Sequence, residues 1–153
     1  MARYSILAIF LCSILLIAGC SGQMVRLSET EHIRPINGVS DLEHVKEAVL
    51  DGIKNAGWVA ESEGSGIIQA TYRIRIHTVH VNIFFTSETY DIRYSSSISM
   101  KMYCTEYDKQ SLYLQVSGNE FCPGNSPPQY INANYTIWVD SLVSAIEESL
   151  ANK

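Results

Sequence analysis

Two histidines three positions apart are the first residues whose types could do chemistry. His77 and His80 suggest a metal pair, because imidazole is a common zinc ligand. Residues three apart in a continuous strand face opposite sides, so the two rings could converge only if a bend separates them. No third ligand stands at suitable spacing nearby. We therefore expect hydrogen-bonded or exposed histidines, with no bound metal and no cofactor.

A second candidate is a cationic row in which Arg73, Arg75 and His77 occupy alternate positions. Alternate positions of a strand share one face, and such a row could hold an anion. Carboxylates available as partners are Glu61, Glu63 and Asp91. A solvated, salt-bridged strand face is therefore the favoured interpretation. Arg75 and His77 remain the candidate ligand or partner surface.

Catalytic patterns are missing from the sequence. No serine stands in a nucleophile-elbow context, and no glycine-rich phosphate loop follows a strand. The carboxylates fall mostly on helix faces and in turns, which does not recommend paired-carboxylate catalysis. We expect a protein that is not an enzyme, with a small hydrolase as the weakest alternative.

An amphipathic segment opens with Ser40-Asp41-Leu42-Glu43. Ser40 and Glu43 form a capping-box pair, in which each side chain can satisfy a backbone N–H of the other residue. Gly57 is a natural helix stop. The apolar residues that share one helical face are Leu42, Val45, Val49, Ile53 and Ala56. The spacing predicts a first helix that ends at Gly57.

Alternation of apolar and polar residues predicts an antiparallel meander after this helix. The apolar positions are even-numbered from Ile68 and odd-numbered from Val79, so a bend or hairpin must intervene near 75–78. The expected strands are 58–62, 68–74, 79–85, 90–94 and 98–102, with turns at 63–66, 75–78, 86–88 and 95–97.

Residues 103–129 break this rhythm and are expected to form an insertion. Leu112, Leu114 and Val116 suggest one more strand inside it. The aromatic residues within it or directly after it are Tyr103, Tyr107, Tyr113, Phe121 and Tyr130. They could form a binding patch for protein or glycan, or they could pack against the sheet edge.

A closing helix is predicted from a third apolar stripe. Its members are Ile131, Tyr135, Trp138, Leu142, Ala145, Ile146 and Leu150. Two amphipathic helices and an alternating sheet bury their apolar sides only by stacking. We therefore expect an α+β domain of two layers, in which a meander of four to five antiparallel strands packs against an N-terminal and a C-terminal helix.

The N-terminus has the pattern of a secretory signal. Arg3 precedes an apolar run from Ile6 to Ile17, which is too short to span a bilayer. The run closes with Leu16-Ile17-Ala18-Gly19-Cys20, which resembles the lipobox of bacterial lipoproteins. In that interpretation residues 1–19 are removed and Cys20 is acylated. An ordinary cleaved signal is the alternative. By resemblance to enterobacterial sorting, Ser21 favours the outer membrane.

Size and charge limit the number of domains and the classes of partner that the processed chain can have. Of 153 residues, 134 would be left after residue 19, enough for one domain. The formal net charge of −5 becomes −6 once Arg3 is removed, which disfavours nucleic acid or anionic lipid as a partner. Residues 20–39 are expected to hold the lipidated cysteine and a flexible tether of roughly 25 Å. Residues 40–153 are expected to form a single globular domain.

Two cysteines remain if Cys12 leaves with the signal and Cys20 carries lipid. Cys104 and Cys122 are expected to pair in an oxidising periplasm and pin the insertion. The chain-entropy model gives such a bridge roughly 3 kcal/mol. A two-cysteine metal site is the less favoured alternative, because histidines or further cysteines at ligand spacing are missing.

Several short motifs resemble a family of small, uncharacterised bacterial lipoproteins. They are Gly57-Trp58, Gly66-Ile67, Arg75-x-His77, Val81-x-Ile83, Tyr90-x-Ile92-x-Tyr94 and Tyr135-x-x-Trp138-Val139. The resemblance covers roughly Leu42 to Leu150 apart from the insertion. It implies a lipoprotein with an α+β layout and brings no activity with it.

These observations together lead to a functional expectation. We expect a lipid-anchored, non-enzymatic accessory module of the outer membrane. Its domain would face the periplasm and meet another envelope protein. The second hypothesis is a binder of a small molecule, an anion or a cell-wall fragment through Arg75 and His77.

Overall fold

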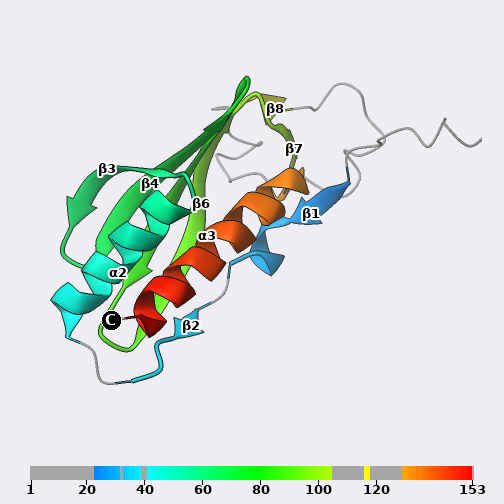
Figure 1. Ribbon diagram of the computed structural model, residues 1–153. Coiled ribbons are helices and arrows are strands. Elements are labelled where there is room, and N and C mark those ends of the chain that lie inside the picture. Colours follow the sequence, from blue (N-terminus) through cyan, green and yellow to red (C-terminus); the bar gives the residue numbers. More distant parts are fainter. Residues whose placement is uncertain (1–22, 32, 39–40, 105–115, 118–128, 153) are drawn as a thin grey trace, which may run out of the picture.

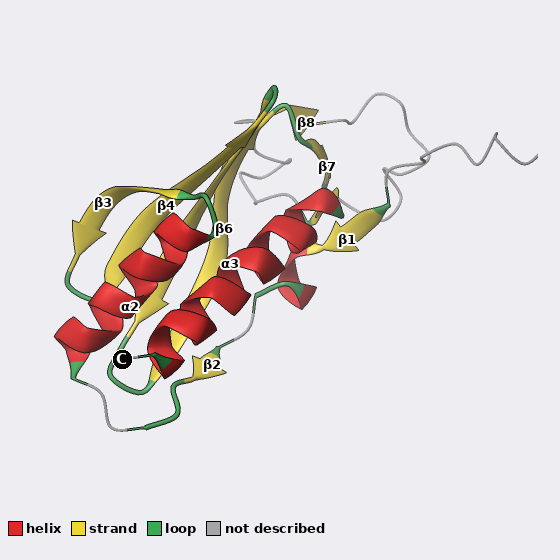
Figure 2. Cartoon of the chain, in the orientation of Figure 1, coloured by secondary structure: helices red, strands yellow, loops and turns green. Residues whose placement is uncertain are grey.

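A computed structural model describes residues 23–31, 33–38, 41–104, 116–117 and 129–152. Two α-helices lie in front of a twisted five-stranded sheet, and a second set of short strands lies beside one end of it (Figures 1 and 2). The elements are β1 (Met24–Arg26), the 3-10 turn η2 (Leu27–Glu29), β2 (Arg34–Pro35), α2 (Leu42–Asn55), β3 (Val59–Gly64), β4 (Ile67–Ile74), β5 (His77–Phe85), β6 (Thr89–Ile98), β7 (Lys101–Tyr103), β8 (Val116–Ser117), β9 (Tyr130–Asn132) and α3 (Asn134–Ala151).

Both sheets are antiparallel. The larger has the order β2-β6-β5-β4-β3 and the smaller β1-β9-β7-β8. Because β3 to β6 are consecutive in the chain and adjacent in the sheet, the predicted α+β class with a meander is confirmed. The first helix is not the first element, since β1 and β2 precede it.

Helix α2 starts one residue later than the capping-box pattern implies. The N-cap is Asp41, whose carboxylate accepts a hydrogen bond of 2.8 Å from the His44 N–H. The prediction of Ser40 as the cap is therefore wrong, because two good caps stand side by side and the second takes the role. Leu42 consequently falls on the exposed side, whereas Val45, Val49 and Ile53 are buried as expected.

The parity switch in the meander is a tight hairpin. Ile74 pairs with His77, so only Arg75 and Ile76 form the turn between β4 and β5. Arg75 has a φ of 54°, the left-handed conformation that such turns demand. The predicted reversal near 75–78 is confirmed.

Strand β6 runs straight through the predicted turn at 95–97. A bulge lets the register step from Val81↔Tyr94 to His80↔Ser96, and this step reverses the faces. Ser97 is therefore buried and Ile98 is half-exposed, so the prediction that Ile98 begins a new strand is wrong. The chain turns instead at Ser99 (φ 58°), after which Met100 and Met102 are buried.

The N-terminal segment is part of the domain. β1 pairs with β9, β2 pairs with β6, and Leu27 between them is buried in the core. The Glu31 carboxylate also accepts the backbone N–H of Tyr94 at 3.1 Å. The predicted flexible tether is therefore wrong for residues 24–31 and 33–36, because these segments satisfy backbone groups at the edges of both sheets.

Helix α3 begins at Asn134, later than the apolar stripe suggests. Ile131 is buried, but it lies in β9, where it pairs with Val25 and Met102. Its assignment to the closing helix is wrong, because the stripe runs on from the strand into the helix. Tyr135, Leu142 and Ile146 are buried as predicted.

Most of the expected insertion lies outside the described residues, including Cys122, Tyr107 and Tyr113, as does Cys20 at the N-terminus. Val116 and Ser117 form β8 beside β7, while Leu112 and Leu114 are not described. Cys104 is 7% exposed after β7, and its pairing with Cys122 stays a prediction. Among the described helices, none is both long and apolar enough to cross a bilayer.

Candidate functional site

The structure separates the two residues expected to share a ligand surface. Arg75 is exposed in the β4–β5 turn. His77 begins β5 on the helix side of the sheet, where its ring lies 6.4 Å from that of Trp138. Its Nδ1 is 2.7 Å from the Ser99 carbonyl oxygen. Because Arg73 lies on the opposite face, beside Glu61, the three residues do not form one cationic row.

The outer face of the sheet, turned away from the helices, carries one of the expected ion pairs, Glu61 with Arg73. Glu63 pairs instead with Lys46, and Asp91 pairs with Arg93. Glu61 lies 3.8 Å from Arg73 and 3.7 Å from His80. His80 Nδ1 also lies 2.7 Å from the hydroxyl of Thr71, a buried residue. Because both partners meet the same ring nitrogen, the histidine cannot relay a proton from the hydroxyl to the carboxylate. This cluster holds neighbouring strands together and presents no nucleophile.

His77 and His80 lie on opposite faces of one continuous strand. No group of three or more histidine, cysteine or acidic side chains that could hold a metal occurs in the described part of the chain. Tyr103 is half-buried in β7, opposite Tyr130.

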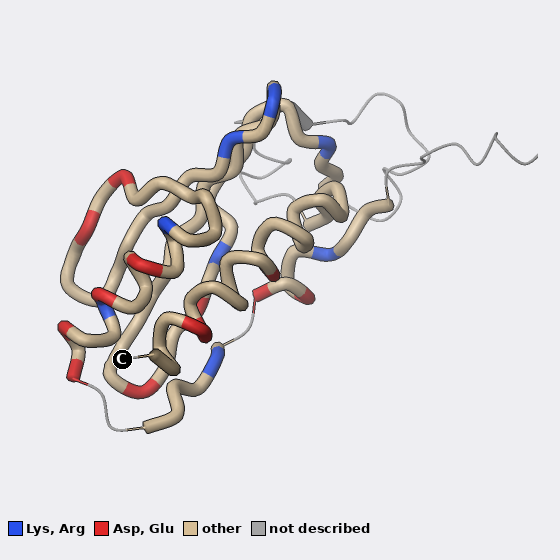
Figure 3. Tube along the Cα trace, in the orientation of Figure 1, with Lys and Arg blue, Asp and Glu red and all other residues tan. Residues whose placement is uncertain are grey.

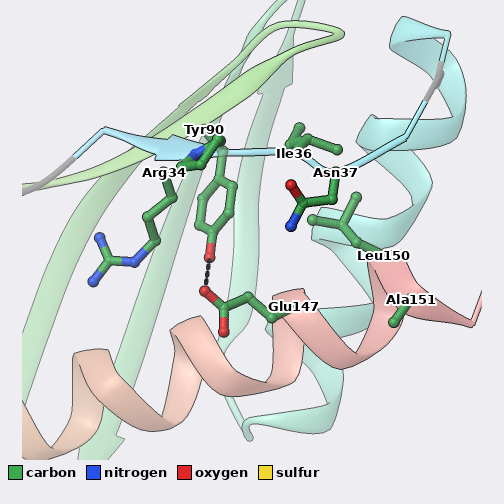
Figure 4. A pocket seen from close by; sticks show the side chains of 8 residues that line it. Arg34, Ile36, Asn37, Tyr90, Glu147, Leu150 and Ala151 are labelled. Atoms are coloured by element: carbon green, nitrogen blue, oxygen red, sulfur yellow. Dashed lines mark hydrogen bonds between the residues drawn. The ribbon is translucent and has the colours of Figure 1, made fainter.

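A groove lies at the C-terminal end of α3. It encloses about 370 Å³, and its lining residues are Arg34, Pro35, Ile36, Asn37, Tyr90, Glu147, Leu150 and Ala151. Three segments far apart in the sequence build it: β2 and the residues after it, the start of β6, and the last turns of α3 (Figure 4). We call it the α3 groove.

Strand pairing and helix length set the polar groups of the α3 groove. Arg34 is the register partner of Tyr90, so the guanidinium and the phenol project from adjacent strands. The Tyr90 hydroxyl donates a hydrogen bond of 3.3 Å to the Glu147 carboxylate (Figure 4). A cation and an anion therefore stand on either side of one phenol.

Electrostatics keeps that phenol protonated. Burial raises the pKa of Tyr90 well above its usual range, and the Glu147 carboxylate raises it further, against a smaller opposing effect of Arg34. A neutral phenol donates a hydrogen bond and cannot serve as a base at ordinary pH. The α3 groove offers the Arg34 guanidinium as a donor and the Glu147 carboxylate as an acceptor. Ile36 and Leu150 form its apolar walls. These are the requirements for binding.

Sequence reasoning missed this groove. Arg34 fell in the presumed tether, Tyr90 was assigned to a strand, and Glu147 was one carboxylate among several on a helix. No local pattern joins them, because only the pairing of β2 with β6 and the length of α3 bring them together.

No protein-family model matches this sequence, and no curated protein or solved structure is significantly similar to it. The resemblance to small bacterial lipoproteins stays a prediction.

Proposed function

We propose that this protein is a lipid-anchored module of the bacterial outer membrane that faces the periplasm and acts by binding. Its partner is a peptide segment of another envelope protein, held in the α3 groove. The observation that carries the proposal is the placement of Arg34 and Glu147 on either side of Tyr90, above apolar walls.

A peptide segment suits this chemistry better than a simple anion. Its carbonyl oxygens can accept from Arg34 and its N–H groups can donate to Glu147, while its side chains contact Pro35, Ile36 and Leu150. A volume of about 370 Å³ lies at the small end of ligand pockets, which fits a few residues of a larger partner. A cell-wall fragment that carries a peptide is the second candidate, since it presents the same groups.

The anchoring part of the proposal depends on the motif that ends in Cys20. Acylation there would place the domain in the envelope, where a disulfide between Cys104 and Cys122 would also form. Cys104 is buried at the end of β7, a position from which a covalent link would fasten the chain that follows.

The binding proposal is tested by photo-crosslinking in intact cells. A photoreactive amino acid at Asn37, which lines the α3 groove, should trap one dominant envelope partner. Glu147→Gln removes the acceptor charge and should lower the yield of that adduct ~10-fold, the loss of one charge-assisted hydrogen bond. Glu148→Gln changes the next residue of α3, outside the lining, and should leave the yield intact.

Equal yields from the Glu147→Gln and Glu148→Gln variants would show that the groove is not the binding site. The absence of any adduct above background would contradict the proposal that the protein binds an envelope partner.

A further inference from the structure

The tip of the β4–β5 hairpin exposes large apolar side chains between positive charges. Ile76 is 73% exposed and Ile74 is 36% exposed, and Arg73 and Arg75 alternate with them. Two-residue turns normally take glycine or asparagine, which tolerate a positive φ. Arg75 at a φ of 54° and an exposed isoleucine beside it are therefore not explained by turn formation.

Contacts place β1 at the same end of the molecule as this tip. His77 meets the Ser99 carbonyl oxygen just before β7 and the ring of Trp138 in the second turn of α3. β7 pairs with β9, and β9 pairs with β1. The N-terminal end of α3, β1, β7 and the hairpin tip therefore form one end of the domain (Figure 1). We call it the hairpin end.

Charge is distributed unevenly between the two ends. Lysine and arginine mark the hairpin tip and β7, whereas acidic residues gather along β3, α2, the β5–β6 turn and the last turns of α3, with a further acidic stretch at the η2 turn that follows β1 (Figure 3). The exposed cations at the hairpin end are Arg26, Arg73, Arg75 and Lys101. Glu61 lies 3.8 Å from Arg73, an exposed pair that costs little to separate.

Chain length ties this end to the proposed anchor. Only three residues separate Cys20 from Met24, the first residue of β1. Four residue steps span at most ~14 Å even when fully extended. With acyl chains on Cys20, as the proposed function requires, the start of β1 lies within ~14 Å of the acylated residue, which brings the hairpin end toward the bilayer.

We propose that the β4–β5 hairpin tip is a second membrane contact, directed at a bilayer with anionic phosphate headgroups. Ile74 and Ile76 enter the interfacial layer, and Arg73, Arg75 and Lys101 bind headgroup phosphates. The net negative charge of the chain does not oppose this contact, because its carboxylates lie mainly toward the other end.

The same contact fixes the direction of the α3 groove. The groove lies at the opposite end of α3, an 18-residue helix that is ~27 Å long. It consequently opens away from the lipid surface and toward periplasmic partners.

The test uses the unlipidated mature chain from Ser21, which contains every described element. Sedimentation with phosphatidylethanolamine vesicles, with and without phosphatidylglycerol, measures binding at low salt. The chain should bind the phosphatidylglycerol vesicles. Ile76→Ser and the pair Arg73→Gln with Arg75→Gln should each weaken binding ~10-fold.

Two matched control variants make the same kinds of substitution away from the hairpin tip. Val59→Ser removes an isolated exposed valine in β3, and Lys46→Gln with Lys54→Gln removes two charges from α2. Both should leave binding unchanged. Failure of the wild-type chain to bind, or equal losses in tip and control variants with native circular dichroism, would overturn the proposal. Because this chain carries no lipid, either result leaves the proposed acylation of Cys20 and the proposed peptide binding in the α3 groove unaffected.

Discussion

Three tyrosines illustrate how single side chains take their properties from burial. Tyr90, Tyr94 and Tyr135 all have a pKa raised above the usual value of 10.0, and in each case burial is the largest cause. Removal from water disfavours the phenolate, so the folded protein retains protons that the unfolded chain releases.

This difference predicts a loss of stability at high pH. Below pH 10 the three phenols are protonated in both states and add nothing to the pH dependence. Above pH 10 the unfolded chain ionises first, so the free energy of unfolding should fall by up to ~1.4 kcal/mol per pH unit for each phenol. Urea unfolding on both sides of pH 10 measures the slope, and Tyr94→Phe should make it shallower.

Lys46 also lowers the free energy of unfolding as the pH rises, because Glu63 raises its pKa. The tyrosine variants are therefore compared in a Lys46→Gln background, which lacks this contribution. An identical slope with and without Tyr94 in that background would contradict the assignment.

At the scale of elements, the two helices are in close contact at Gly52. A Cβ added there would lie 2.6 Å from the Ile146 Cα, a distance that backbone atoms cannot accommodate without moving apart. The absence of a side chain at this position of α2 is therefore what lets α2 and α3 pack together on the sheet.

Gly52→Ala should accordingly destabilise the protein. At an exposed helical position the same change stabilises by ~1 kcal/mol, whereas here overpacking should cost ~1–3 kcal/mol. Chemical denaturation followed by circular dichroism measures the difference. Lys54→Ala, an exposed change on the same helix, should stay close to wild type. A stabilised Gly52→Ala variant would mean that the helices have room between them.

Elements with long periodic patterns could be predicted from the sequence, and those set by distant partners could not. The stripe from Val45 to Ile53 and the alternation from Val79 to Phe85 each report a local period. β1 and β2 are too short to show one, and their strand character depends on β9 and β6. The bulge near Ser95 has no sequence signal, yet it reverses every face after it.

At the scale of the whole molecule, one hydrophobic core joins both sheets. It includes Leu27 from the N-terminal segment, residues of both helices, and the methionines at β7. The candidate site follows from this arrangement and not from any motif. Arg34, Tyr90 and Glu147 were each visible in the sequence, but only the completed fold places them around one groove.

The proposed anchor makes a prediction at this same scale. Cells fed a labelled fatty acid should incorporate it into the wild-type protein, and Cys20→Ala should abolish the label and move the protein to the soluble envelope fraction. Cys104→Ala is the control, because it leaves Cys20 in place and should remain labelled. Labelling that survives Cys20→Ala, or no labelling of the wild-type protein, would contradict the proposed acylation of Cys20.

The pairing of β1 with β9 has a consequence for biogenesis. β1 is synthesised long before its partner β9, so it stays unpaired until β9 follows. In the proposed lipoprotein, the residues that precede β1 would therefore be open to processing enzymes until β9 and α3 have crossed the inner membrane. Closure of the domain would then be a late step, and the proposed maturation of the N-terminus could precede it.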